Sequence, residues 1–173
     1  MSLSPRGRAK AETAAKTLLS TSLSAIYTSP IDRCRETAEI IASDRQLTPK
    51  TEKGVTEIDF GSWTGRTLKS LQRNSRWNTV QNVPSRFTFP DGESFVDAQS
   101  RAVIAIEGIA AAAKRSAVVV VSHADVIKLV LSHYLGQPLD LFQRIVVETT
   151  SVSELVLSPD RAPQVASING RGS

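Results

Sequence analysis

Two strand-like segments of this chain end in polar residues that could hold an anion. Residues 24–28 are short, β-branched and aromatic, and they lead into a helix that carries Arg33 in its first turn. Residues 117–121 are followed directly by Ser122 and His123. Ligands of open α/β sheets bind beyond the carboxyl ends of the strands, so Arg33 and His123 could converge on one phosphate. Free N–H groups at the helix start would add further donors.

Both residues also have a simpler interpretation. An arginine such as Arg33 is more often a solvated helix residue, and a histidine such as His123 packs without function about as often as it acts. Their joint position at two strand ends favours the functional interpretation, because ionisable groups that gather in a cleft are typical of active sites.

A further chemical candidate lies in the glycine-containing segment 55–65. A carboxyl group beside a phosphate has its pKa raised by the dianion, and it could protonate the leaving oxygen of a phosphate ester. Glu57 is the candidate for this role, although Asp59 is a neighbour of the same type and composition alone does not choose between them. The segment could equally be no more than a turn.

The elements that must position these residues alternate between helical and strand-like patterns. This alternation predicts a three-layer α/β/α sandwich around a mostly parallel sheet. Residues 117–121 are apolar without alternation, which predicts an interior strand buried on both faces. The expected helices cover residues 4–19, 31–43, 68–77, 93–114 and 126–135, and the expected strands cover residues 24–28, 117–121, 151–157 and 163–168.

The composition bounds what these elements can form. With 173 residues, 40% of them hydrophobic, we expect a single domain over residues 1–173 in which the looser section 44–91 is a cap or substrate loop. The net charge of +4 and the 5% aromatic content argue against a nucleic-acid partner. The single cysteine, Cys34, excludes an internal disulfide, and no apolar run is long enough to cross a membrane. We therefore expect a cytoplasmic protein without a membrane partner.

Ordered blocks of the sequence resemble the motifs of the histidine phosphatases, the phosphoglycerate-mutase-like family. Residues 29–38 are similar to S-P-L-x-R-x-x-x-T-A, and residues 57–65 are similar to E-x-x-x-G-x-W-x-G. Residues 90–94 carry the G-E-S element, and residues 120–124 resemble the V-S-H strand end. Residues 3–7 look like the L-T-x-x-G that opens the family's first helix. Together the blocks cover nearly the whole chain, which is far more specific than one short motif.

The resemblance implies an activity and a site. The activity is that of a phosphatase or phosphomutase that acts on a small phosphorylated substrate through a phosphohistidine, without a metal or another cofactor. A homodimer is left open. The resemblance implies that Arg33 and His123 contact the phosphoryl group and that Glu57 is the general acid. It also implies three residues near the substrate, which are Glu93, Ser94 and Ser122.

One part of the family pattern is absent from this sequence. The family's nucleophile is the histidine of an R-H-G motif at the end of its first strand, and the only histidines here are His123 and His133. A start site placed too late, a trimmed chain or a natural pseudoenzyme that only binds phospholigands would explain this, and we favour the first two. The family's first strand is central in its sheet, so we expect unpaired edges on the neighbouring strands. We also expect residues 1–173 alone to hold an anion without appreciable turnover.

Overall fold

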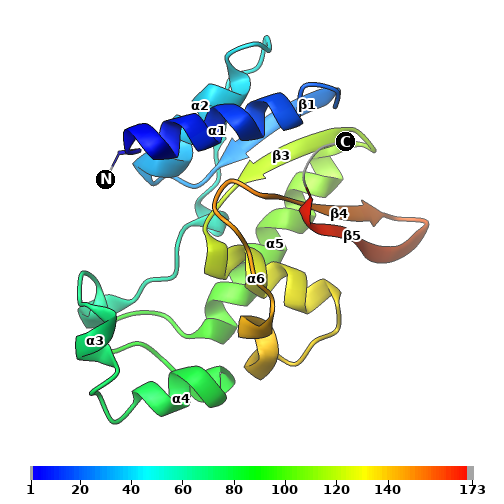
Figure 1. Cartoon of the computed structure of the whole chain (residues 1–173). Helices are drawn as coiled ribbons and strands as arrows, with labels where there is room; N and C mark the ends of the chain where they lie inside the picture. The colour runs from blue at the N-terminus through cyan, green and yellow to red at the C-terminus, as the bar shows by residue number, and fades with distance from the viewer. Residues whose placement is uncertain (1, 171–173) are drawn as a thin grey trace.

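The computed structural model describes residues 2–170, and its elements follow the alternation expected from the sequence (Figure 1). Among the described helices, none is long and apolar enough to cross a membrane. The helices are α1 (Pro5–Thr17), α2 (Asp32–Ala42), α3 (Leu68–Leu71), α4 (Trp77–Asn82), α5 (Phe95–Ala113) and α6 (Ala124–Tyr134). The strands are β1 (Leu23–Thr28), β2 (Lys50–Thr51), β3 (Ala117–Val121), β4 (Val152–Ser158) and β5 (Arg161–Gly170).

Parallel strands in the order β2-β1-β3 form the central sheet. β1 pairs with β3 from Leu23 opposite Ala117 to Thr28 opposite Val121, so both strands end at the same edge. α1 and α2 lie over one face of this sheet, and α5 and α6 lie on the other side (Figure 1). The three-layer α/β/α arrangement expected from the sequence is therefore confirmed.

β3 corrects one expectation, because it is an edge strand of the three-stranded sheet and not an interior strand. Ala117 is exposed, and Val118, Val119, Val120 and Val121 are only half-buried. β4 and β5 form a separate antiparallel pair, so within residues 2–170 the second edges of β3 and β4 have no strand beside them. These edges agree with the expectation of unpaired neighbouring strands. The apolar residues of a strand favour burial, but the extent of their burial depends on the elements that lie beside the strand.

Two apolar clusters hold the layers together. The larger one is aromatic and joins section 44–91 to α5 and α6. The buried ring of Trp63 lies 5.3 and 5.6 Å from the ring centroids of Phe87 and Phe89. Buried aromatic pairs of this kind contribute about 0.5–1.5 kcal/mol each beyond the area they bury. The smaller cluster includes residues of the sheet and of α1 and α2, and its buried members are Leu18, Ile26, Ala38, Ile41 and Ala42.

Section 44–91 contains two short helices, α3 and α4, where one helix over residues 68–77 was expected. Between them, Asn74 forms a turn in which its Oδ1 accepts the N–H of Arg76 at 2.9 Å. The asparagine side chain competes with the helix for backbone hydrogen bonds, which explains the interruption. The role of the section as a cap or substrate loop stays a prediction.

Gly61 gives a direct test of the close packing in this section. Its φ of +50° lies in the left-handed region, and a Cβ there would clash with the backbone of Pro90 and Asp91. We expect Gly61→Ala to lower the free energy of unfolding by at least about 3 kcal/mol, since backbone atoms must move. In the matched control Gly65→Ala, the φ of +78° is similar but no atom lies within 4 Å, so only about 1 kcal/mol of strain is expected. Urea unfolding measures both losses, and equal values would contradict the clash.

Candidate active site

The ends of β1 and β3 bring the candidate residues together. The N–H of Ser29, just beyond β1, donates to the carbonyl oxygen of Val121 at the end of β3, at 2.9 Å. α2 then begins and presents Arg33 in its first turn, while His123 is the N-cap residue of α6 directly after β3. Because the parallel strands end at one edge, two residues 90 positions apart in the sequence become neighbours.

Arg33, Glu57 and His123 form one hydrogen-bonded group. Nη2 of Arg33 donates to Nδ1 of His123 at 2.7 Å and to Oε2 of Glu57 at 3.3 Å. The same Glu57 oxygen lies 3.5 Å from Nδ1 of His123. The exposed fraction of the side chain falls from 42% for Arg33 to 24% for Glu57 and 2% for His123, so the group opens to solvent on its arginine side. The structure brings the three residues together, and their catalytic roles stay a prediction.

His123 is buried as a neutral imidazole. Burial disfavours the charged ring, and the positive charges of Arg33 and Arg101 add to this effect, so the pKa of His123 is lowered from 6.5 to about 4. The Arg33 guanidinium has donors but no acceptor, so Nδ1 must be the accepting nitrogen of the ring. Nδ1 of His123 therefore carries no proton while it accepts the hydrogen bond from Arg33.

Burial also shifts the Glu57 carboxyl group toward its protonated form. Its pKa is raised mainly by burial and further by the charge of Asp125, while the N–H of Ile58 and two arginines act in the opposite direction. A raised pKa favours the protonated form, which is the form that acts as a general acid. Asp59 is placed differently, because its Oδ1 accepts the N–H of Gly61 at 2.9 Å and shapes a turn. The geometry thus distinguishes Glu57, which contacts Arg33 and His123, from Asp59, which stabilises a turn, whereas composition alone does not distinguish them.

The other candidates are tied into the frame of the site. Ser122 Oγ donates to the carbonyl oxygen of Val55 at 2.7 Å. Ser94 is the N-cap residue of α5, and its Oγ accepts a backbone N–H of the first turn at 3.0 Å. Glu93 accepts the N–H of Asp59 through Oε1 at 2.8 Å. All these side chains have protein partners, and their contact with a substrate stays a prediction.

Arg101 on α5 supports the site, although no sequence motif indicated it. Its Nε and Nη2 donate to the two carboxylate oxygens of Glu93 at 2.9 and 2.6 Å. Its Nη1 and Nη2 also donate to the carbonyl oxygens of Gly54 at 2.8 Å and Glu57 at 3.2 Å. The guanidinium therefore ties the loop that carries Glu57 to α5. In the sequence, the one feature that could have indicated Arg101 is that it is the only basic residue between Phe95 and Ala113.

Two buried residues of segment 29–38 lie against the His123 ring. Ser29 has no exposed surface, and its Oγ is 2.8 Å from Nε2 of the ring. Cys34 is also buried, with its Sγ 3.6 Å from the same nitrogen. Burial raises the pKa of the Cys34 thiol to about 11, so this thiol stays protonated near neutral pH and is a packing group.

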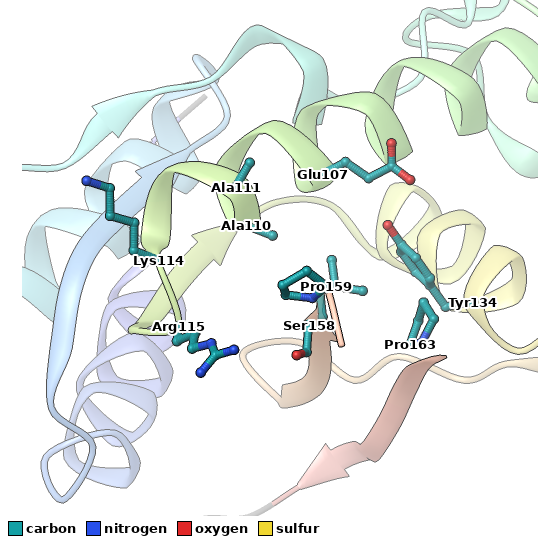
Figure 2. A pocket seen from close by; sticks show the side chains of 10 residues that line it. Glu107, Ala110, Ala111, Lys114, Arg115, Tyr134, Ser158, Pro159 and Pro163 are labelled. Atoms are coloured by element: carbon teal, nitrogen blue, oxygen red, sulfur yellow. The ribbon is translucent and has the colours of Figure 1, made fainter. Parts of the chain in front are cut away.

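A cavity of about 530 Å³ lies elsewhere, surrounded by α5, the end of α6 and the β4–β5 hairpin (Figure 2). The hydroxyl of Tyr134 in its wall is buried and has no hydrogen-bond partner among residues 2–170. The pKa of Tyr134 is raised by burial and by the charge of Glu107. None of Arg33, Glu57 and His123 lines this cavity, so it is separate from the group at the carboxyl edge of the sheet.

The fold and the site together define a class of protein. An arginine at a helix N-terminus, a buried neutral histidine and a carboxyl group with a raised pKa meet at the carboxyl edge of a parallel sheet. In the described part of the chain, no group of three or more His, Cys, Asp or Glu side chains could hold a metal ion. These groups suit an α/β domain that binds phosphate esters. The chain matches the histidine phosphatase superfamily (branch 1) over residues 1–170 and belongs to that family.

Individual relatives agree with this assignment. Phosphoserine phosphatase 1 of Hydrogenobacter thermophilus is 29% identical over 164 residues, which cover 92% of this chain and 76% of that protein. The probable phosphoglycerate mutase GpmB of Proteus mirabilis is 28% identical over 156 residues, which cover 88% of this chain and 72% of that protein. The solved structure of Bacillus stearothermophilus YhfR has a TM-score of 0.90 at 29% identity, covering 99% of this chain and 85% of that chain. Three curated mycobacterial relatives, among them the bifunctional protein Rv2228c of Mycobacterium tuberculosis, are 28% identical over 151 residues, and this chain spans 42% of their length.

The protonation of His123 can be tested through stability. Its pKa in the folded chain, about 4, lies below the ordinary 6.5, so the unfolded chain takes up this proton first as the pH falls. The contribution of the neutral His123 ring to the free energy of unfolding is fully present above about pH 6.5. It is lost as the pH falls toward 4, and the loss is on the order of 3 kcal/mol. Urea unfolding should show the stability difference between wild type and His123→Gln shrinking by that amount. Glu57, whose raised pKa works in the opposite direction, is present in both proteins. A difference that does not change with pH would contradict the neutral ring.

Proposed function

We propose that this family member hydrolyses phosphate monoesters through a phosphohistidine intermediate. The observation that carries the proposal is the convergence of Arg33, Glu57 and His123 at the carboxyl edge of the sheet. This group combines a permanent positive charge, a buried imidazole and a carboxyl group whose pKa is raised by burial. Phosphoryl transfer depends on such groups, because charge on the phosphoryl oxygens and on the leaving oxygen must be stabilised in the transition state.

Arg33 provides the anion site in this proposal. Its side chain is 42% exposed, so a phosphate dianion can reach the guanidinium from solvent. The N-terminus of the 11-residue α2 adds backbone donors beside it. A bound dianion would draw Arg33 away from Nδ1 of His123 and would favour a proton on that nitrogen, because an opposite charge nearby stabilises the imidazolium form.

Glu57 supplies and recovers the proton of the reaction. As a histidine nitrogen bonds to phosphorus, the bond from phosphorus to the leaving oxygen breaks, and the Glu57 carboxyl group gives its proton to that oxygen. Water then attacks the phosphohistidine and gives a proton to the Glu57 carboxylate. This second step releases inorganic phosphate and the free histidine, and it returns Glu57 to its protonated form.

The attacking histidine in this proposal is neither of the two in residues 1–173. His123 stands at the V-S-H strand end, which the family resemblance assigns to contact with the phosphoryl group and not to attack, and His133 is exposed on α6. Residues 1–173 alone would therefore bind phosphate esters without appreciable turnover, and activity would require an R-H-G strand beside them. The same observation favours a second candidate, a non-catalytic module that binds phospholigands.

Hydrolysis is preferred over mutase chemistry because section 44–91 is of moderate length. A mutase must keep its phosphorylated intermediate away from water, which usually requires a long closing segment. The proposed substrate is a small phosphate ester, processed in the cytoplasm without a metal. The relative named phosphoserine phosphatase 1 supports the proposal of hydrolysis, whereas the relative GpmB is named as a probable phosphoglycerate mutase.

Phosphate binding tests the anion site in the chain as it stands. Calorimetric titration with inorganic phosphate should show binding that Arg33→Ala weakens by about 10- to 100-fold, since hydrogen bonds to a charged group contribute about 1.5–3 kcal/mol. Arg35→Ala is the matched control, because Arg35 is exposed and lies 3.9 Å from Asp32 on the same helix. This control should bind phosphate as the wild type does. Equal losses in the two variants would show that only the net charge matters.

Turnover requires a form of the protein to which the R-H-G strand has been added, and there Glu57 is the residue to test. Glu57→Gln should lower kcat by about 10²–10⁴-fold on an alkyl phosphate, and much less on p-nitrophenyl phosphate, whose leaving group needs no proton. Asp59→Asn should remain active, because asparagine retains the Oδ1 that accepts the N–H of Gly61. EDTA should leave the rate unchanged. If the added strand restores no turnover, the binding module replaces hydrolysis as the function.

A further inference from the structure

Ser29 is fully buried where β1, β3 and α2 meet. Its N–H donates to the carbonyl oxygen of Val121 at 2.9 Å, and its Oγ accepts the N–H of Ile31 at 3.3 Å. Backbone and side chain are therefore both held in place by the fold itself. In this position Oγ lies 2.8 Å from Nε2 of His123.

The neighbours of the His123 ring decide which nitrogen carries the proton. Arg33 Nη2 can only donate, so Nδ1 at 2.7 Å accepts and carries no proton. A neutral imidazole holds its single proton on the other nitrogen, so Nε2–H donates to Ser29 Oγ. Both ring nitrogens have partners in a side chain that is only 2% exposed.

We propose that Ser29 is a positioning residue that anchors His123 through Nε2–H and so keeps Nδ1 facing Arg33 and Glu57. The hydrogen bond made by one nitrogen of a histidine sets the orientation and the role of the other. A flip of the ring would remove the acceptor from a buried donor, which is costly. The catalytic meaning of the anchor rests on the proposed function. When Arg33 turns to a phosphate, Nδ1 takes a proton from solvent and donates a hydrogen bond to a phosphoryl oxygen, while Nε2–H remains bonded to Ser29.

Cys34 is the competing neighbour of the same nitrogen. Its Sγ lies 3.6 Å from Nε2 and 3.9 Å from Nδ1 of His123, so the sulfur faces both ring nitrogens at similar distances. A thiol is a weak acceptor, and Sγ also lies 3.5 Å from the carbonyl oxygen of Ser122, to which it can donate. Cys34 therefore packs against the ring without selecting a nitrogen, and Cys34→Ala is the matched control for Ser29.

The experiment is nitrogen-15 NMR of the uniformly labelled chain, whose two histidines give two sets of ring signals. In the wild type, His123 should show an unprotonated Nδ1 and a protonated Nε2 whose hydrogen exchanges slowly with water. Ser29→Ala should speed this exchange by about tenfold, because the buried donor loses its acceptor. Cys34→Ala should leave the exchange within about twofold, and Ser29→Thr, which retains a hydroxyl, should preserve it. The exposed His133 is the internal reference in every sample.

Three results would overturn the anchor. A wild-type spectrum with the proton on Nδ1 does so whether or not any variant folds. Unchanged exchange in folded Ser29→Ala does so as well, and so does an equal effect of Cys34→Ala. Inorganic phosphate separates this proposal from the proposed function. An anchored His123 whose signals do not respond to phosphate would support the role of Ser29 and contradict the phosphate site.

Discussion

The site depends on the hydrogen bond from Nη2 of Arg33 to Nδ1 of His123. This bond is possible because β1 and β3 are parallel neighbours, so the helix start after one strand and the histidine after the other occupy the same edge. The guanidinium places a permanent positive charge beside a buried ring, and charge and burial together hold His123 neutral. Glu57 completes the group from a third segment of the chain, in contact with both partners.

A second layer of contacts holds the group in position. Arg101 joins the carboxylate of Glu93 to backbone carbonyl groups of the loop that carries Glu57. On the opposite side of His123, Ser29 meets Nε2 from the end of β1. Most of these contacts are partly buried, where an unpaired polar group costs about 1–3 kcal/mol, so each partner has little freedom to leave. Arg33 is the most exposed member of the group, so the group meets solvent on its arginine side.

The strands of the described structure have unpaired edges. β4 and β5 pair only with each other, and β3 has one paired edge, so within residues 2–170 the backbone N–H and C=O groups on the second edge of β3 have no strand partner. Such edges are able to pair with another strand. The side chains of β3 are also only partly covered, because its four valines are half-buried and leave part of their apolar surface exposed.

By itself, the sequence determined the alternation of helices and strands, the three-layer class and the candidacy of Arg33, Glu57 and His123. These features depend on local periodicity and on short motifs, both of which are present in the order of the residues. Only the tertiary structure showed the physical difference between Asp59 and Glu57, which the family motif had implied as the acid: Glu57 accepts a hydrogen bond from Arg33, whereas Asp59 accepts the N–H of Gly61. Arg101 emerged in the same way, since its partner carbonyl groups lie 44 and 47 positions away in the sequence. β3 proved to be an edge strand for a similar reason: what lies beside a strand depends on the rest of the chain and not on the strand's own residues.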